Sequence, residues 1–452
     1  ICQSPNLDAL ARRGVVFDRA YCQGSWCLPS RQSFMYGRYQ GKGAQTIGEC
    51  LREKQFHTTR VGKIFHMRVP GDIIDGTNGP DVAECWTQRF NSSGREAHTP
   101  GFYACLNQNI FTTAPENRQS TRMPHRMFVT VRYKDDSKDP QTVQPDEKSA
   151  EKAIELLGQR SREYHQNGTP FFLAVGLVRP HYPMVAPQSD FDRYPHLDNL
   201  LPSYPKEDDS DIPPMGRGQT RNASNAIGKY PENQQRFWTG YYASVTFMDR
   251  QVGRILRALK DQGLDESTMV IFCSDHGYNL GDHGFWQKST LHEEVTRVPL
   301  IVSLPQSAAT DGQNGSTKPR VVNRHEDAFA ELVDLFPTIC DWCGVAKPAD
   351  VQGRSLLDLV EDRTQSLPWR DGALSLHRGA ALRTKDWMVS RYESGKQELY
   401  DMQNDPNQFT NLAEMPEHAK TLRRLNRALD QRLKDAEVKI RKRSRKGSGA
   451  RK

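Results

Sequence analysis

The stretch "GYYASVTFMDRQVGRILRALKDQGLDESTMVIFCSDHG", residues 240–277, places a helical pattern directly before a strand pattern. Apolar residues recur at helical spacing up to Gly263, and the continuous apolar run "TMVIFC" begins at Thr268. Continuous apolar runs are typical of strands buried on both faces, as in a parallel sheet. The stretch therefore predicts a helix and then a buried strand that ends just before Asp275 and His276.

The same alternation occurs elsewhere in the chain. "SAEKAIELLGQRSREY" from Ser149 predicts a helix, whereas "FFLAVGLV" from Phe171 and "VPLIVSLP" from Val298 predict buried strands. Helices between such strands indicate parallel β-α-β units, so we expect an α/β fold with a mostly parallel central sheet between helices. In folds of this class, functional sites lie at the carboxyl ends of the strands.

The pattern divides the chain into three parts. Residues 1–350 form the large α/β domain. Residues 351–438 contain short segments, including "GAALRT", "WMVSRY" and "QELYDM", that predict a small antiparallel sheet, followed by a polar helix from Pro416. Residues 439–452 contain eight Lys or Arg and no acidic residue, which predicts a disordered basic tail.

Composition excludes several classes of protein. Of the 452 residues, 36% are hydrophobic and 26% are charged, which is typical of a globular chain. Apolar runs such as "FFLAVGLV" are too short to cross a bilayer, so we expect no membrane span. The net charge of +7 arises from the basic tail, which leaves the rest of the chain nearly neutral. We therefore expect no specific nucleic-acid partner, although the tail allows non-specific contact with polyanions.

Three groups of polar residues follow predicted strands. They are Asp275-His276 with the nearby Lys288, then Lys63 and His66 in "RVGKIFH", and His181 in "VRPHYP". Asp-His-Gly alone could simply cap a helix. Because strand-end loops converge in an α/β sheet, we expect all three groups to form one polar site for a divalent metal or an oxyanion.

One further motif identifies a family. In "SWCLPSRQSFMYGR", residues 25–38, Cys27-Leu-Pro-Ser-Arg31 and the later Gly37-Arg38 resemble the signature of the sulfatases. "SPNLDALARRGVVFDRAY" from Ser4 and the late "ELYDMQNDPNQFTNLA" are similar to two more segments of that family. The resemblance extends over nearly the whole chain except the basic tail. It implies an alkaline-phosphatase-like sandwich in which residues 1–350 are the catalytic domain.

Two details are similar to the iduronate-2-sulfatase group. The Lys-to-His spacing in Gly62-Lys63-Ile-Phe-His66 is one residue longer than the commoner Gly-Lys-Trp-His pattern. Asp275-His276 stands where many sulfatases have Asp-Asn. These details indicate a subgroup and leave the sugar and the sulfate position open.

The resemblance implies a role for each cation and for the cysteine. Cys27 would be oxidised to formylglycine by a formylglycine-generating or anaerobic sulfatase-maturating enzyme, and the hydrated aldehyde would attack sulfur. Arg31 would hold the formylglycine. Lys63 and Lys288 would neutralise the sulfate oxygens, a charge that hydrolysis of an anionic ester requires.

The resemblance also implies the proton-transfer groups and a metal. His181 would be the general acid for the leaving oxygen, and His66 would help to deprotonate the diol. Asp275 would ligate one divalent ion, expected to be Ca²⁺, together with the modified Cys27, and His276 would be a ligand or lie close to one.

One departure from the family pattern concerns the metal. Sulfatases carry an Asp-Asp pair on a first strand upstream of the Pro-Asn-Leu-Asp segment, and this sequence begins only a few residues before that segment. We expect that strand and two metal ligands to be missing because the sequence is a fragment, with a degenerate family member as the alternative. The sequence as it stands is then expected to bind metal weakly and to have little activity.

These observations leave three functional hypotheses. The first is a sulfuric ester hydrolase that removes sulfate from a sulfated sugar or glycosaminoglycan. The second is a phosphodiester or phosphonate hydrolase of the same superfamily, and the third is a non-catalytic relative that binds sulfated glycans. The family resemblance also implies export to the periplasm, the lysosome or the cell exterior.

Overall fold

The computed structural model describes most of the chain. The described residues are 2–118, 128–136, 138–194, 204–205, 207–217, 227, 230–305, 309–310, 317–318, 323–363 and 369–440. Almost all of the predicted tail, residues 439–452, lies outside them.

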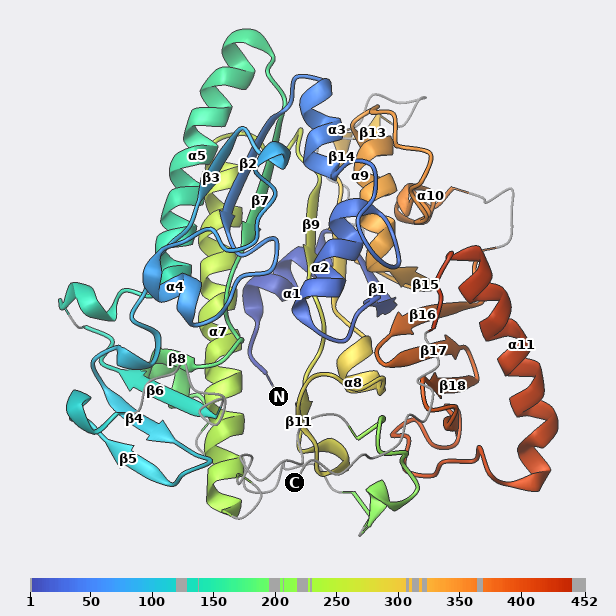
Figure 1. The fold of residues 1–452 in the computed structure, drawn as a ribbon. Helices are drawn as coiled ribbons and strands as arrows, with labels where there is room; N and C mark the ends of the chain where they lie inside the picture. Colours follow the sequence, from blue (N-terminus) through green and yellow to red (C-terminus); the bar gives the residue numbers. More distant parts are fainter. Residues whose placement is uncertain are drawn as a thin grey trace, which may run out of the picture.

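Two sheets make up the centre of the large domain (Figure 1). The first has the strand order β15-β1-β12-β9, and the second has the order β3-β2-β7. Pairing is parallel in the second sheet and between β1 and β15, whereas β12 pairs antiparallel with both β1 and β9. The strands are β1 (Val15–Tyr21), β2 (His57–Gly62), β3 (Gln88–Phe90), β7 (Phe171–Gly176), β9 (Val270–Cys273), β12 (Leu300–Ser303) and β15 (Arg324–Glu331).

Helices cover both faces of these sheets, as the apolar strand β7 illustrates. Phe171 and Leu173 pack with Leu157 of α5 and Leu259 of α7, whereas Phe172 and Ala174 face the cluster built by α2, α3 and α9. Because successive side chains of a strand point to opposite faces, both faces of β7 must be apolar. The helices are α1 (Pro5–Arg12), α2 (Cys27–Tyr36), α3 (Ile47–Glu53), α5 (Pro145–Asn167), α7 (Pro231–Asp261) and α9 (Leu335–Trp342).

A third sheet and several short elements lie beside this centre. The third sheet has the order β5-β4-β6-β8, and it lies next to the lower half of α7 in Figure 1. Its strands are β4 (Phe102–Cys105), β5 (Ile110–Thr112), β6 (Val129–Tyr133) and β8 (Met184–Pro187). The short elements are α4 (Gly71–Asp75), α6 (Gln188–Phe191), α8 (Glu293–Thr296), α10 (Leu357–Val360), β10 (Asn279–Leu280), β11 (Trp286–Gln287), β13 (Ala309–Thr310) and β14 (Thr317–Lys318).

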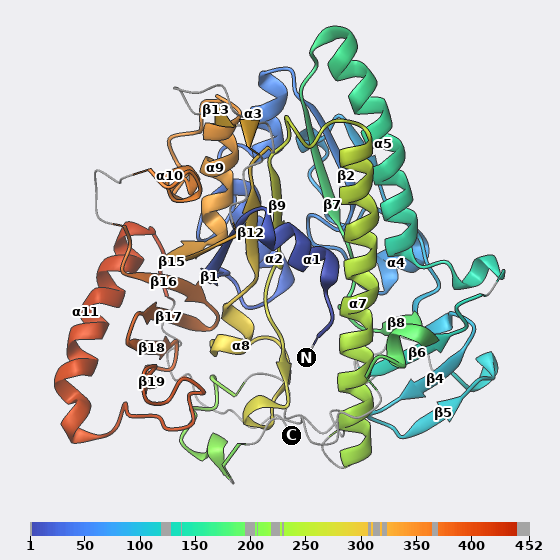
Figure 2. The same cartoon turned by 180° about the vertical axis from the view of Figure 1, so that it is seen from behind.

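The C-terminal part is an antiparallel meander with one helix on it. Its strands are β16 (Gly372–Leu376), β17 (Gly379–Thr384), β18 (Trp387–Tyr392) and β19 (Gln397–Asp401), and α11 spans Ala419–Asp435. Leu425, Leu429 and Leu433 form one apolar stripe of α11 that packs on Leu382 and Val389 of the sheet. Figure 2 shows this part on the side of the molecule opposite to α5.

The fold prediction is confirmed: an α/β sandwich with parallel strand pairs at its centre carries a smaller antiparallel sheet at its C-terminal end. The antiparallel pairs of β12 are a feature that the apolar runs did not reveal. None of the helices in the described ranges is long and apolar enough to cross a membrane.

Candidate active site

Cys27 is the first residue of α2, where the helix presents free backbone N–H groups. The partial positive charge at this end of a helix favours anions. The other end of α2 explains the Gly37-Arg38 pair. Gly37 ends the helix with a φ of +65°, which favours glycine, and a Cβ there would lie 3.1 Å from Phe336. Arg38 forms an ion pair with Asp350. Gly37 therefore allows the helix to end here, and Arg38 anchors that end.

Two lysines converge on the sulfur of Cys27. Lys288 Nζ lies 3.2 Å from Cys27 Sγ, and Lys63 Nζ lies 3.6 Å from it. Burial raises the pKa of the Cys27 thiol, but the charges of Lys63 and Lys288 outweigh this effect and hold the pKa well below its usual value. A group with negative charge is thus stabilised at this point.

Arg31 connects the strand ends around Cys27. Its Nε donates to Asp275 Oδ2 at 2.7 Å, and its Nη1 donates to the backbone oxygens of Lys63 and Ile64 at 2.6 and 2.9 Å. Ser30 donates from Oγ to the backbone oxygen of Asp275. The Ser-Arg pair therefore ties α2 to the ends of β2 and β9, which brings two of the three predicted groups together.

Two histidines present the same ring nitrogen to the site. The Nδ1 of His276 lies 2.8 Å from the Gly277 carbonyl oxygen, and the Nδ1 of His181 lies 2.8 Å from the Tyr182 carbonyl oxygen. Since a carbonyl only accepts, the Nδ1 of each ring donates, which leaves Nε2 as the nitrogen that faces the site. His276 Nε2 lies 3.4 Å from Lys288 Nζ. His276 Nε2 lies 3.3 Å from Cys27 Sγ.

His181 is a neutral imidazole in this arrangement. Burial, together with the charges of Lys63 and Lys288, lowers the pKa of His181 to about 3, against the opposing effect of Cys27. Burial also lowers the pKa of Lys63, whereas the attraction of Cys27 and neighbouring groups outweighs burial at Lys288 and raises its pKa. Of these groups, Lys288 holds its proton most firmly.

The loop that carries His181 is anchored by groups that the motif analysis missed. Arg179 forms an ion pair with Glu96 at 3.2 Å, and both side chains are fully buried. Asp146 accepts hydrogen bonds from the backbone N–H groups of Val178 and Arg179 at 2.7 and 2.9 Å. The arginine directly before Pro180 was a visible signal, but its acidic partners lie 83 and 33 residues away.

His66 has a different setting from the other predicted residues. Its ring packs edge-on against Trp26, with the ring centroids 6.2 Å apart. Within the described residues, its Nδ1 is buried without a hydrogen-bond partner. Tyr182 was not predicted. Its ring lies tilted against that of His181, with the ring centroids 4.3 Å apart, and its phenol interacts electrostatically with Lys288 and Cys27.

The predicted metal ligands lie together but form an incomplete calcium site. One donor atom each from Cys27, Asp275 and His276 lies within 4.8 Å of the others, and Asp275 is shared with Arg31. Calcium takes six to eight oxygen ligands. These three residues of the described chain supply one carboxylate, one imidazole and one sulfur, so by themselves they do not fit Ca²⁺.

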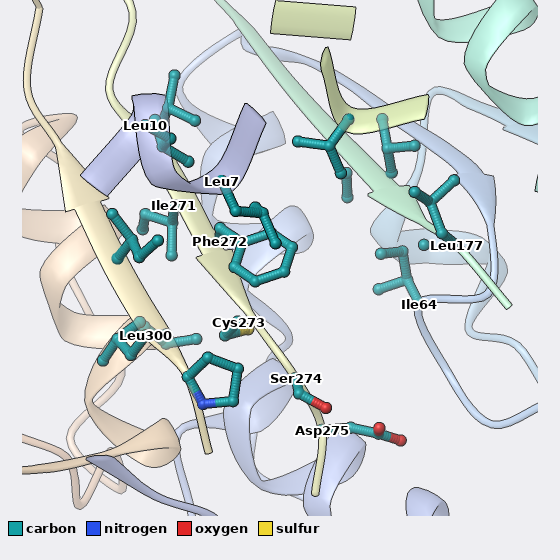
Figure 3. Close-up of a pocket in the computed structure, with 18 of the residues that line it drawn as sticks. Leu7, Leu10, Ile64, Leu177, Ile271, Phe272, Cys273, Ser274, Asp275 and Leu300 are labelled. Atoms are coloured by element: carbon teal, nitrogen blue, oxygen red, sulfur yellow. The ribbon is translucent and has the colours of Figure 1, made fainter. Parts of the chain in front are cut away.

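A large cavity of about 1240 Å³ extends from this cluster between the two central sheets. β7 and β9 are the end strands of their sheets, and both line it. Figure 3 shows side chains from both flanks, including Leu177 and Phe272, pointing toward the space between the strands, with Asp275 at one end. Protein interiors rarely leave apolar voids of this size. Its shape is that of a slot between two strand edges.

Sequence comparisons place the chain among known proteins. The family model described as Sulfatase matches residues 77–345, and the model described as N-sulphoglucosamine sulphohydrolase, C-terminal, matches residues 281–435. The iduronate 2-sulfatase of Mus musculus is 30% identical over 387 residues, which are 77% of this chain and 66% of that protein. A sulfatase of Formosa agariphila is 27% identical over 91% of this chain and 78% of its own length.

Solved structures agree with these matches in fold. The phosphonate monoester hydrolase of Silicibacter pomeroyi superposes with a TM-score of 0.72 and 21% identity, over 97% of this chain and 92% of that one. This likeness shows the alkaline-phosphatase-like fold. The match to the mouse iduronate 2-sulfatase covers 66% of that protein, so the chain spans just under two thirds of its length. With the family model matching more than half of its residues, the chain belongs to the sulfatase family.

Proposed function

We propose that this protein hydrolyses sulfate esters of a sulfated sugar or glycosaminoglycan, in the manner of the iduronate-2-sulfatase group, with formylglycine at position 27. The observation that carries the proposal is the approach of Lys63 and Lys288 to within 3.6 Å of Cys27 Sγ at the N-terminus of α2. Arg31 adds a third positive charge, since its Nη1 donates to the backbone oxygen of Lys63. Buried positive charge at a reacting atom stabilises the charge that develops when an anionic ester is cleaved.

The residues would divide the work as follows. The formylglycine would supply a hydroxyl that attacks sulfur and a second hydroxyl whose deprotonation later expels sulfate. Lys63 and Lys288 would hold the sulfate oxygens in place. The S–O bond to the sugar breaks, and the departing oxygen takes a proton from the protein.

His181 and Lys288 are the two candidate donors of that proton. With a pKa of about 3, His181 is unprotonated in the free site, and the negative charge of a bound ester opposes the effect of the lysines and raises that pKa. We therefore assign His181 as the general acid only in the ester complex, and Lys288 as the group that holds its proton throughout. His66 is proposed as the base for sulfate release.

Mass spectrometry of the protein from its native host tests the first step. Trypsin would release residues 20–31, which contain both Cys22 and Cys27. An aldehyde at position 27, with an unmodified thiol at position 22, is the expected result. An unmodified Cys27 in protein that nevertheless hydrolyses sulfate esters would refute the proposed nucleophile.

A second candidate is a phosphodiester or phosphonate hydrolase. The fold likeness to the Silicibacter pomeroyi enzyme favours it. Rates on an aryl sulfate and an aryl phosphodiester, measured with the same protein, separate the two, and we expect the sulfate to be preferred. Binding of sulfated oligosaccharides without turnover of either ester, by protein carrying the aldehyde, would instead support the non-catalytic hypothesis.

We also propose that a further β-strand occupies the slot between β7 and β9 and completes a calcium site at Asp275. Both strands carry apolar side chains that line the cavity, both present a backbone edge that is unpaired among the described strands, and both run toward Asp275 in Figure 3, so an inserted parallel strand would end beside Asp275. Residues 1–452 produced alone should bind an apolar dye in this slot and little Ca²⁺. Tight calcium binding by that chain would refute the proposal.

Export from the cytoplasm is proposed on the family resemblance.

A further inference from the structure

An exposed tryptophan directly precedes the nucleophile position. Trp26 is 39% exposed, whereas its neighbours Ser25 and Cys27 are 0% and 2% exposed. Trp26 is thus a large apolar side chain that is open to solvent directly beside the buried cation site. Within the described residues, only five large hydrophobic side chains are exposed, and Trp26 is the one tryptophan among them.

The backbone around Trp26 is held on two sides. The Ser25 carbonyl oxygen accepts a hydrogen bond from the Ser289 N–H at 3.1 Å, and Ser289 follows Lys288. On the other side, the chain enters α2 at Cys27, and the indole itself makes no capping hydrogen bond to the helix. The backbone on both sides of Trp26 is therefore held in place, while the indole is not needed to cap the helix.

His66 supports the ring from the side. It meets Trp26 edge-on at 6.2 Å between centroids, which leaves an indole face uncovered. Its buried Nδ1 has no hydrogen-bond partner within the described residues. A buried ring nitrogen of this kind is satisfied when a ligand or an ordered water reaches it. A solvent-open indole and a buried ring nitrogen without a partner among the described residues thus lie side by side, and Trp26 is next to Cys27 in the sequence.

We propose that Trp26 is the platform on which the sugar ring that bears the sulfate stacks, with His66 as a neighbouring hydrogen-bond partner. This inference rests on the proposed function. The cations recognise only the sulfate, so a separate surface is needed to bind the uncharged ring. Ligand sites commonly combine a flat aromatic surface with a few convergent polar groups. The ester oxygen joins ring and sulfate, which places the ring within reach of the residue beside Cys27.

The test separates binding of the ring from binding of the sulfate. Dissociation constants are measured calorimetrically for inorganic sulfate and for monosulfated disaccharides from heparin and chondroitin sulfate, using full-length protein from the native host. Trp26→Ala should weaken binding of the best disaccharide about tenfold, which corresponds to about 1.4 kcal/mol, and leave sulfate binding unchanged. Trp26→Phe, which keeps an aromatic face, should lose about threefold.

Phe111→Ala is the matched control, because Phe111 is a 37% exposed aromatic residue on β5 in the peripheral sheet. In turnover assays, Trp26→Ala should raise KM for the disaccharide and leave kcat within about twofold. Unchanged disaccharide binding by Trp26→Ala would overturn the platform, and so would an equal loss of sulfate binding, which would indicate a structural role. Wild-type protein that binds neither sulfate nor any disaccharide would refute the proposed function and the platform with it.

Discussion

The buried ion pair between Glu96 and Arg179 allows a quantitative test of how the His181 loop is held. Both side chains are fully buried, and Arg179 also donates to the carbonyl oxygens of His181 and Val185. Removing one partner of such a pair leaves an uncompensated buried charge, which costs about 3–5 kcal/mol. The two single substitutions should differ in pH dependence, because an arginine cannot release its proton whereas a glutamate can take one up.

Glu96→Gln removes the ion-pair partner of Arg179 at every pH and leaves Asp146 as its nearby carboxylate, so its cost should be nearly constant from about pH 5.5 to 8. Arg179→Met leaves Glu96 buried without its cation. Burial already raises the pKa of Glu96 in the native protein despite Arg179, and buried glutamates without a cation reach a pKa of about 8 to 9. The folded variant then holds a proton that the unfolded chain has lost, so stability falls as pH rises. The loss is about 1.4 kcal/mol per pH unit, or about 3 kcal/mol between pH 5.5 and 8.

The assay is urea unfolding at several pH values, with each variant compared with wild type at the same pH. The expected result is a large, flat cost for Glu96→Gln and a cost for Arg179→Met that is small at pH 5.5 and large at pH 8. A double variant, Glu96→Leu with Arg179→Met, should remove the pH dependence and keep a cost of about 1–3 kcal/mol, because carbonyl oxygens lose their donor. Equal pH profiles for the two single variants would refute the assignment of a charged Glu96.

Three other substitutions have defined outcomes. Burial raises the pKa of Glu294 to about 7, so Glu294→Gln should stabilise the fold above pH 7 by up to about 3 kcal/mol and have no effect near pH 4. Urea unfolding at both pH values tests this, and equal effects at the two would contradict it. Gly37→Ala should lower the free energy of unfolding by about 2 kcal/mol because of its positive φ and the contact with Phe336, and an unchanged urea midpoint would show that the helix end adapts. Lys288→Met should weaken inorganic sulfate binding by about 10- to 100-fold, measured by calorimetry at constant ionic strength, whereas an unchanged constant would remove Lys288 from the anion site.

Periodicity located the regular elements well where a strand or helix has one clear pattern. β17 and β18 match the predicted "GAALRT" and "WMVSRY", and β7 and β9 fall inside the predicted apolar runs. The helix expected from Gly240 begins at Pro231 instead, because its first six residues, PENQQR, carry no apolar stripe. Proline at the first helical position was the available signal.

The chemistry of the site was predictable where it follows strand ends. Lys63, His181, Asp275, His276 and Lys288 all lie around Cys27, since these strand ends meet at one edge of the two sheets. Their roles remain predictions. His66 was expected beside the nucleophile, and the structure places its ring against Trp26.

Long-range ion pairs were beyond the reach of sequence patterns. Glu331 is fully buried and pairs with Arg370 and Arg432, and it accepts hydrogen bonds from Tyr39 and the Leu374 N–H. These partners come from the central α/β part and from the C-terminal part of the chain. A single sequence shows that each residue is charged, but which charges meet depends on how distant segments pack.

The same charges that recruit an anion also govern proton transfer at this site. Among the described residues there, Arg31, Lys63 and Lys288 face one carboxylate, Asp275, so the buried cluster carries an excess of positive charge before a ligand binds. Burial is the largest cause of the low pKa of His181, and the charges of Lys63 and Lys288 lower it further. A bound sulfate ester compensates the excess and so raises the pKa of His181, whereas the larger effect of burial remains. An anionic substrate would therefore favour acid catalysis by His181, because the substrate supplies negative charge that offsets the effect of Lys63 and Lys288 on the imidazole.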